Sequence, residues 1–298
     1  MGTLPAQDYL PLAVMIGRGF AAQEGLRIVE VPMSGGPAIL EALAEGAIDT
    51  GNPGTIPVLQ AAARSLVPDK AIAVAATSFH DPQHPGTGVL VGPGVGDWQD
   101  LKDQHLAVHS KGSLNAVALA IRLQDEGVRA YDLVEIPFAN MGLAVRDGSV
   151  AAAVLNDPYL AQSLLRGDGR LLGYIIGGPP FERFQLSMVT FRTRLLNEKP
   201  QLVEAYLRAY VRSIRWTNRH PAEAGRLQAH RLNLDEATAA RSAPVLWRDP
   251  PRNDPQLLEQ LQQKLLEQGW LREKIPVERL YDESLLDSVL AGRAPKQR

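Results

Sequence analysis

The chain has 298 residues, of which 45% are apolar and 21% are charged, as is typical of a globular protein and not of a disordered or fibrous one. Its formal net charge of -2 gives no long-range attraction to nucleic acid or to an anionic membrane. The sequence has no apolar run as long as the roughly 18 residues of a membrane span, and it has no cysteine, which excludes disulfides, thiolate nucleophiles and cysteine-based metal sites.

The first part of the chain alternates strand-like and helix-like patterns. Helices are predicted at 11–20, 36–45 and 55–64, and strands at 26–31, 47–51 and 71–78. A Pro/Gly-rich stretch at 81–88 then precedes a second round, with strands predicted at 106–108, 133–136 and 150–155 and helices at 113–126, 141–147 and 158–166. This order indicates an α/β fold with mostly parallel, buried sheets.

Two stretches of the first round recur in the second. Val-Glu-Val-Pro at 29–32 corresponds to Val-Glu-Ile-Pro at 134–137, and Gly-Ala-Ile-Asp-Thr-Gly at 46–51 to Gly-Ser-Val-Ala-Ala-Ala at 148–153. Any two βαβ units share a glycine before a strand, so chance similarity is one explanation. Two lobes of like construction explain better why both pairs occur in the same order.

The last third is predicted to be helical after one more strand from Gln185, which would return the chain to the first lobe. Helices are expected at 200–218, 221–231, 235–246, 255–268 and around 283–290. We therefore expect a discontinuous first lobe of residues 1–80 plus 184–298 and a second lobe of residues 81–183. A ligand would lie in the cleft between them, where strand carboxyl ends meet helix N-termini.

The loops that open helices at these strand ends supply the candidate ligand-binding residues. They are Gln7, Asp8, Tyr9, Ser34, Gly35, Asn52, Gly54, Thr55, Ser110, Lys111, Gly112, Ser113, Asn140, Asn156 and Asp157, together with Ser78 and His80 at the expected lobe crossing. The loop from Ser110 to Ser113 suits an oxyanion, because Lys111 adds a charge at a helix N-terminus. The alternative is that Ser113, like Asp157 before Pro158, only caps a helix.

Signatures of catalysis are absent from the sequence. It contains no nucleophile elbow and no P-loop, and the run Gly-Pro-Gly-Val-Gly at 92–96 leads into a turn and not into a phosphate-binding helix. The six histidines lack metal-ligand spacing. We therefore expect no catalytic residue, no metal and no cofactor.

Several segments together resemble the solute-binding proteins of aliphatic-sulfonate, taurine and nitrate ABC transporters. They are G-F-A-A-Q-E-G-L at 19–26, L-E-A-L-A-E-G-A-I-D-T-G at 40–51, D-L-K-D-Q-H-L-A-V-H-S-K-G-S at 100–113, the D-P-Y stretch at 157–159 and R-H-P-A-E-A at 219–224. The resemblance implies a type II periplasmic-binding fold that closes over a small organic anion, such as a sulfonate or an aromatic or heterocyclic acid. It also implies a monomer that docks on a membrane permease, and a ligand site that includes Lys111, Gly112, Ser113 and the loops at 52–55 and 157–159.

The chain departs from that family pattern at the cleft. Sulfonate binders tend to have an aspartate and two tryptophans where this chain has Ala151, Ala153 and Asn156, which implies a roomier and more polar wall. A lyase of the menaquinone-pathway type, using Asp157 or His80, is the alternative on the same fold, and a cytoplasmic sensor is a third. We expect an exported protein, periplasmic or at the cell surface, whose leader is absent from this sequence; the protein would be cytoplasmic if Met1 is the native start.

Overall fold

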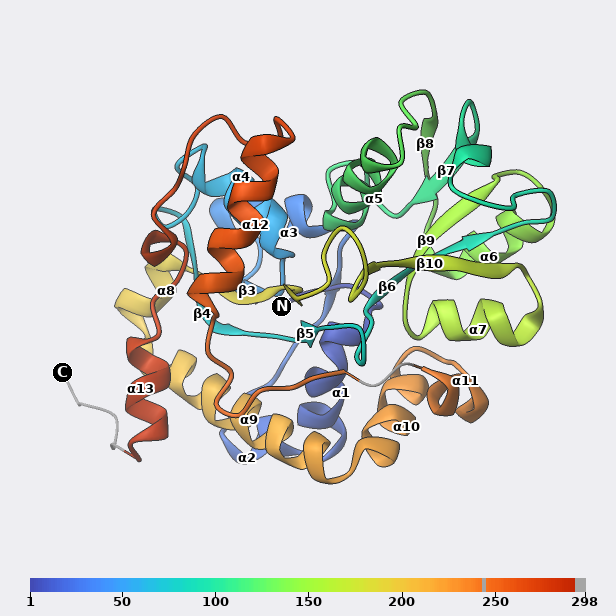
Figure 1. Ribbon diagram of the computed structural model, residues 1–298. Helices are drawn as coiled ribbons and strands as arrows, with labels where there is room; N and C mark the ends of the chain where they lie inside the picture. The colour runs from blue at the N-terminus through green and yellow to red at the C-terminus, as the bar shows by residue number, and fades with distance from the viewer. Residues whose placement is uncertain (243–244, 293–298) are drawn as a thin grey trace.

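The computed structural model describes residues 1–242 and 245–292 and shows two lobes side by side, each built on a five-stranded sheet (Figure 1). In the first lobe the strand order is β2-β1-β3-β12-β4. These strands are β1 (Gly2–Thr3), β2 (Val31–Pro32), β3 (Thr50–Gly51), β4 (Ala71–Ala76) and β12 (Met188–Arg192). β1 runs parallel to β2 and β3, whereas β12 is antiparallel to β3 and β4.

The second lobe repeats this arrangement with the order β8-β7-β9-β6-β10. Its strands are β6 (Thr87–Val91), β7 (His105–Val108), β8 (Asp132–Glu135), β9 (Ala152–Asn156) and β10 (Arg170–Ile176). β7 is parallel to β8 and β9, and β6 is antiparallel to β9 and β10. The strands of the two echoing stretches therefore occupy equivalent places: β2 corresponds to β8, and β3 to β9.

Helices cover both faces of each sheet (Figure 1). The first lobe carries α1 (Leu10–Gly17), α2 (Phe20–Gln23), α3 (Gly36–Glu45), α4 (Thr55–Ala62), α8 (Thr193–Glu198), α9 (Pro200–Arg219), α10 (Pro221–Arg231), α11 (Glu236–Arg241), α12 (Pro255–Glu267) and α13 (Ser284–Leu290). The second lobe carries α5 (Leu114–Asp125), α6 (Phe138–Arg146) and α7 (Tyr159–Arg166). Short 3-10 turns lie at η1 (Gln7–Tyr9), η2 (Gln99–Leu101) and η3 (Val277–Arg279).

The strands alternate their side chains between two apolar layers, as a sheet buried on both faces requires. In β9, Ala152 and Val154 join the layer that contains α5, whereas Ala153 and Leu155 join the layer of α6 and α7. The α5 layer is continuous with the apolar layer under α3, α4 and α12 of the first lobe. Apolar packing therefore runs from one lobe into the other.

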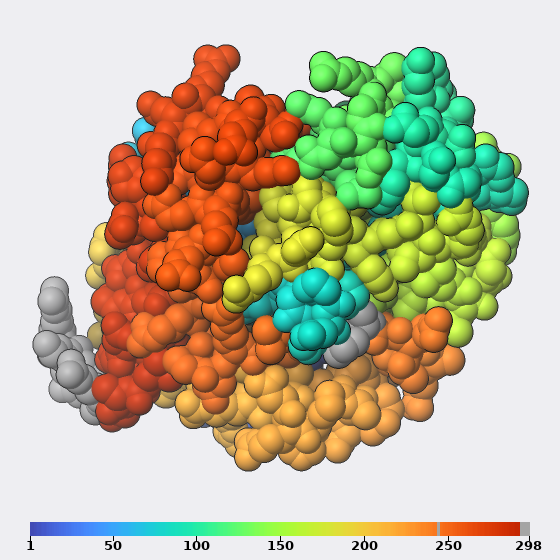
Figure 2. Space-filling view, viewed as in Figure 1, coloured from blue at the N-terminus to red at the C-terminus, as the bar shows by residue number. Residues whose placement is uncertain are grey.

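The chain passes between the lobes at a two-stranded pair, β5 (Phe79–His80) and β11 (Phe184–Gln185). In Figure 2 the loop after β5 and the loop before β11 lie on the viewed face, over the junction of the lobes. The expected boundaries of the second lobe, residues 81 and 183, remain a prediction. The β5–β11 pair lies directly outside them in the sequence.

Several predicted elements differ from the structure. The strand expected at 26–31 is confined to β2, because this segment lies at the edge of the sheet and pairs on one side only. The helix expected at 11–20 is divided into α1 and α2, with Gly19 in the left-handed region at a φ of 70°. Part of the helix expected at 235–246 falls on residues 243–244, outside the described residues, and α11 ends at Arg241.

Strands β6 and β10 were not predicted. In each sheet four strands run in the same direction and one, β12 or β6, runs opposite to them, so the sheets are mostly parallel as expected. β6 follows a run of prolines and glycines that reads as a loop, and it is buried along its whole length. Within 1–242 and 245–292, no helix has the length and apolar character needed to cross a membrane.

Candidate functional site: a cleft between two lobes

A cleft between the lobes is lined by residues of both. Its cavity volume is about 40 Å³, within about 420 Å³ of space that is free of protein atoms and includes open solvent. The first lobe contributes Leu4, Ala6, Asp8, Gly36, Asn52, Gly54, Pro57, Leu186 and Ser187, and the second contributes His109, Ser113, Leu114, Asn115, Phe138 and Asn156. Its lining, as far as the structure is described, contains no lysine or arginine.

Four helices begin at this cleft. Gly36, Leu114 and Phe138 are the first residues of α3, α5 and α6, and Gly54 directly precedes α4. The first turn of a helix has backbone N–H groups without intrahelical partners and a partial positive charge. The cleft therefore favours a hydrogen-bond acceptor or an anionic group of a ligand, without a cationic side chain.

Asp8 places a carboxylate in the first-lobe wall. It lies in η1 and is 5% exposed, and the Ser187 hydroxyl donates to its Oδ2 at 2.7 Å. The Thr77 hydroxyl donates to the Ser187 carbonyl at 3.0 Å and lies 2.6 Å from Ser187 Oγ. Burial raises the pKa of Asp8 to about 6, against the lowering effect of the Ser187 hydrogen bond. Keeping an ionised carboxylate here costs the folded protein free energy.

Asn52 lies beside Asp8 in the same wall and is 3% exposed. Its backbone N–H donates to the Tyr9 hydroxyl at 3.1 Å, and that hydroxyl donates to the Gly2 carbonyl at 3.2 Å. The side-chain Oδ1 of Asn52 is buried and has no hydrogen-bond partner. Tyr9 thus fixes the Asn52 backbone, while the Asn52 side chain retains an acceptor that the protein does not satisfy.

A stack of aromatic rings forms part of the second-lobe wall. His109 stacks on Phe138 with ring centroids 4.5 Å apart, and Phe138 lies nearly parallel to Tyr159 at 6.0 Å. Burial lowers the pKa of His109 to about 4, so the ring is neutral at ordinary pH. Its Nδ1 is buried and has no hydrogen-bond partner. The wall offers an aromatic surface with one unused polar atom.

Asn156 is held in a chain of side-chain hydrogen bonds. The Asn115 amide donates to Asn156 Oδ1 at 2.6 Å, and the Asn156 amide donates to Thr87 Oγ1 at 3.2 Å. All three residues are buried. The amide that stands where sulfonate binders tend to place a tryptophan is therefore fixed by α5 and β6, and it lines the cleft opposite Asn52 and Gly54.

The two lobes touch along the helix N-termini. A methyl group added at Gly35 would lie 3.0 Å from Ser110 Cβ, and one at Gly54 would lie 3.1 Å from Leu114 Cβ. One at Gly112 would lie 3.2 Å from Pro37 Cγ. Side chains larger than hydrogen would hold the lobes apart at these points, so the structure shows the cleft in a closed arrangement.

Of the predicted site residues, five line the cleft: Asp8, Asn52, Gly54, Ser113 and Asn156. Ser113 also accepts from the Ala116 N–H as the N-cap of α5. Gly35, Ser110 and Gly112 lie where the lobes touch. Lys111, Ser34 and Asn140 are exposed. Gln7 lines a neighbouring cavity under α1 and α10, and the Thr55 hydroxyl donates to the Gln185 carbonyl.

His80, Ser78 and Asp157 do not line the cleft. His80 Nδ1 donates to the His84 carbonyl and its Nε2 accepts from the Ser78 hydroxyl, so both ring nitrogens are used within the crossover. Burial lowers the pKa of His80 to about 4. Asp157 Oδ1 accepts from the Ala161 N–H in the first turn of α7. These side chains serve the crossover and the helix start.

The cleft residues that were not singled out include His109, Asn115, Phe138 and Ser187. The first three lie in or beside loops that the sequence placed at strand ends. Their position was therefore predicted, but they were not chosen as ligand-binding candidates. Ser187 follows β11, far along the chain, and reaches the cleft because β12 inserts between β3 and β4. In 1–242 and 245–292 no group of three or more His, Asp or Glu side chains is arranged to hold a metal ion.

Two lobes of matching strand order around one cleft define a periplasmic-binding fold. The sequence profile of the NMT1-like family matches residues 1–232, and the chain belongs to this family. The resemblance drawn from the sequence motifs is thereby confirmed.

Several known proteins are similar to this chain in sequence or in fold. A Bacillus subtilis (strain 168) protein named for binding aliphatic sulfonates is 25% identical over 256 residues, which are 83% of this chain and 73% of that protein. The periplasmic nitrate-binding protein NrtA of Synechocystis PCC 6803 is similar in structure, with a TM-score of 0.79, 13% identity and coverage of 98% of this chain and 87% of that one. The desulfurization enzyme DszB shares the fold at a TM-score of 0.70 and 18% identity, covering 97% of each chain.

Proposed function

We propose that this chain is the solute-binding component of an ABC importer, which captures a small organic acid between its lobes and delivers it to a membrane permease. One observation carries the proposal: four helix N-termini and polar groups of both lobes converge on a single cleft, and the lobes touch around it. Reversible closure over a ligand needs these features and no chemistry. The names of the sulfonate and nitrate relatives support the same role.

The same proposal includes the setting of the protein. It acts as a monomer, in the periplasm or at the cell surface, with the second lobe formed by 81–183. The relatives named as periplasmic binding proteins support this location. A closed lobe pair would present a surface that an open pair lacks, and a permease would distinguish the two states by it.

The test is calorimetric titration with a panel of organic sulfonates, carboxylates and heteroaromatic acids, followed by mass spectrometry of the ligand after prolonged incubation. We expect saturable binding of one molecule per chain and an unchanged ligand mass. Consumption of the ligand at a rate proportional to protein concentration would contradict the proposal.

An enzyme on the same fold is the second candidate, because DszB shares it. The residues first considered for a lyase, Asp157 and His80, are used in the α7 start and in the crossover. The titratable groups in the cleft are Asp8 and His109, and burial shifts the pKa of both. An Asp8→Asn variant separates the candidates, since turnover by an acid or base at this position would be abolished while a binding protein shows no turnover in either form.

A further inference from the structure

The two walls of the cleft offer different chemistry to a ligand. The first-lobe wall carries two acceptor groups, the Asp8 carboxylate and Asn52 Oδ1, and the second-lobe wall carries the rings of His109 and Phe138. The helix N-termini between them offer donors. A ligand that uses all three must combine an acceptor, a donor and a flat surface.

The acceptor side of the first lobe is not satisfied by the protein. Asn52 is 3% exposed, lines the cleft and has no partner at Oδ1. Asp8 is 5% exposed and receives the Ser187 hydroxyl at Oδ2. A buried acceptor without a donor costs free energy, which a ligand N–H group would recover on binding.

The cleft lining lacks a cation that would neutralise Asp8. The described lining has no lysine or arginine, and the nearby Lys111 is exposed. Arg231 acts on the Asp8 charge from outside the lining, but it is paired with Glu30. An acid without any donor would be repelled by the Asp8 carboxylate, whereas an acid that also carries an amino or ring N–H group would place a donor there. Charge complementarity therefore disfavours anions that carry no hydrogen-bond donor.

The stacked aromatic rings favour a planar ligand over a flexible aliphatic one. His109 and Phe138 both line the cleft and stack at 4.5 Å, and the outer ring is neutral. A ligand ring stacked on these side chains would stabilise the complex by more than the burial of its surface alone. The buried Nδ1 of His109 lacks a partner and would accept from or donate to a polar substituent at the ring edge.

We propose that the ligand is an aromatic or heteroaromatic acid that also carries an N–H or amino donor, with the acid group at the helix N-termini, the ring against His109 and Phe138, and the donor on Asp8 and Asn52 Oδ1. This inference rests on the proposed solute-binding function and narrows it to a substrate class. Asp8 and Asn52 become the residues that determine specificity.

The experiment compares five sulfonates in calorimetric titration of the full chain. Sulfanilate and metanilate carry a ring and an amino group, benzenesulfonate carries the ring alone, homotaurine the amino group alone, and butanesulfonate neither. We expect sulfanilate or metanilate to bind about tenfold or more tighter than the other three, since a hydrogen bond to a charged group contributes at this level.

Two variants test whether the donor is recognised where we place it. Asp8→Asn removes the charge and keeps an acceptor for Ser187, and Asn52→Ala removes an acceptor that has no partner, so both are expected to fold. Each should bring the affinity for the aminated acid down to that for benzenesulfonate. Asp69→Asn, an exposed aspartate of the same lobe, is the matched control and should leave the preference intact.

Different results would overturn the ligand class and the solute-binding function on which it rests. Equal affinities for sulfanilate and benzenesulfonate, tighter binding of butanesulfonate, or no binding of any of the five compounds would overturn the inference. The solute-binding function would be overturned only by the broad panel and the turnover assay described above.

Discussion

The two lobes have the same strand order and present opposite chemistry to the cleft. Strands β1, β2 and β3 occupy the places that β7, β8 and β9 hold in the other lobe, and the crossing strand β12 occupies the place of β6. Yet one wall carries Asp8, Asn52 and glycines, and the other carries stacked rings and paired amides. A repeated framework therefore sets where the ligand lies, and the unlike loop residues set what it is.

The largest expected effect is that of Asn156→Trp in the second-lobe wall. An indole would fill the cleft and break the hydrogen bonds to Asn115 and Thr87, so we expect ligand affinity to fall roughly a hundredfold or more. Calorimetry measures this. Asn140→Trp, at an exposed asparagine of α6, is the control, and Asn156→Leu separates loss of the hydrogen bonds from filling. An unchanged affinity in Asn156→Trp would mean that the cleft is placed wrongly.

Asp8→Asn should change stability in a pH-dependent way. In the unfolded chain the carboxyl has a pKa near its ordinary 3.8, and burial raises the pKa to about 6 in the folded state. The folded state keeps its proton longer, so stability falls as pH rises through this window, by roughly 3 kcal/mol for about two pKa units.

The variant lacks this loss and should be the more stable protein at about pH 7, with little difference at about pH 3. Urea denaturation at both pH values measures the effect, with Asp69→Asn as the control. Lower stability of Asp8→Asn than wild type at neutral pH would show that the carboxylate stabilises the fold and is not held there at a cost.

Gly54→Ala tests whether the lobes must meet. Gly54 has ordinary extended backbone angles, so alanine brings no strain in the first lobe, but its methyl group would lie 3.1 Å from Leu114 Cβ of the second. We expect about tenfold weaker binding with an unchanged melting temperature of the free protein, because only closure is opposed. Gly225→Ala, whose methyl meets Ala239 Cβ at 3.7 Å within one lobe, should leave affinity unchanged.

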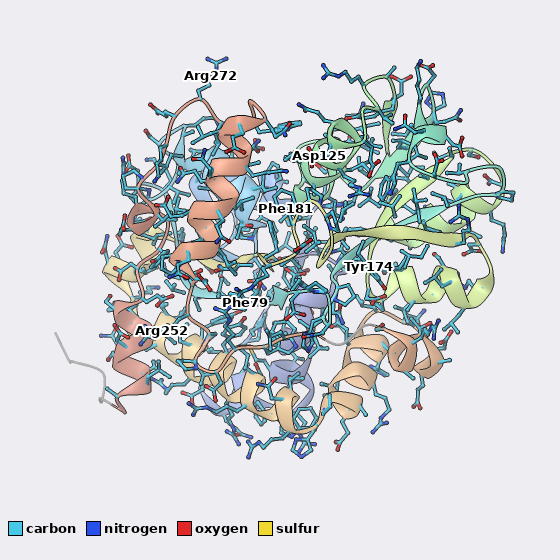
Figure 3. All side chains as sticks on the ribbon, in the orientation of Figure 1. Phe79, Asp125, Tyr174, Phe181, Arg252 and Arg272 are labelled. Carbon is cyan, nitrogen blue, oxygen red and sulfur yellow. The ribbon has the colours of Figure 1, made fainter. Side chains whose placement is uncertain are left out.

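The smallest expected effect is at an ion pair that joins the lobes outside the cleft lining. Lys264 of α12 and Asp125 of α5 form an ion pair of 3.1 Å between the lobes, and Figure 3 shows Asp125 on the side of α5 that faces α12. Both side chains are about a third exposed, so the pair contributes less than about 1 kcal/mol to the closed state.

Lys264→Ala should therefore raise the ligand dissociation rate by no more than about fivefold, and high salt should reproduce the change in wild type. Stopped-flow fluorescence measures the rate. Lys274→Ala breaks the ion pair with Glu259 inside the first lobe and is the matched control. Equal rates in the two variants would show that the pair between the lobes does not resist opening.

Local sequence pattern predicted much of the framework. The echo of residues 29–32 at 134–137 located equivalent strands, β2 and β8, because short apolar strands before helix-opening loops leave a periodic signal. Strands β6 and β10 were missed. The glycines and prolines before β6 are typical of a loop, and its partners β9 and β10 lie far along the chain.

The candidate site was predictable in its loops and not in its contacts. Asp8, Asn52 and Asn156 follow strand ends, where ligands commonly lie, and all three line the cleft. The bonds that fix them join distant segments: Ser187 to Asp8, Tyr9 to Asn52, and Asn115 to Asn156. Tertiary pairings of this kind leave no spacing in the sequence. The comparison with sulfonate binders, which tend to have tryptophan at this position, drew attention to Asn156 but could not identify its hydrogen-bond partners.

The proposed function requires the two lobes to open and close around a solute, and a distance across the cleft reports this motion. The chain has no cysteine, so thiols introduced at two exposed arginines, Arg272 at the tip of the first lobe (Figure 3) and Arg129 in the second, can carry a fluorescent pair without further changes. We predict that energy transfer rises saturably on titration with the tightest-binding acid and reverses on dialysis. A transfer efficiency that no bound acid changes would contradict closure of the lobes over the ligand.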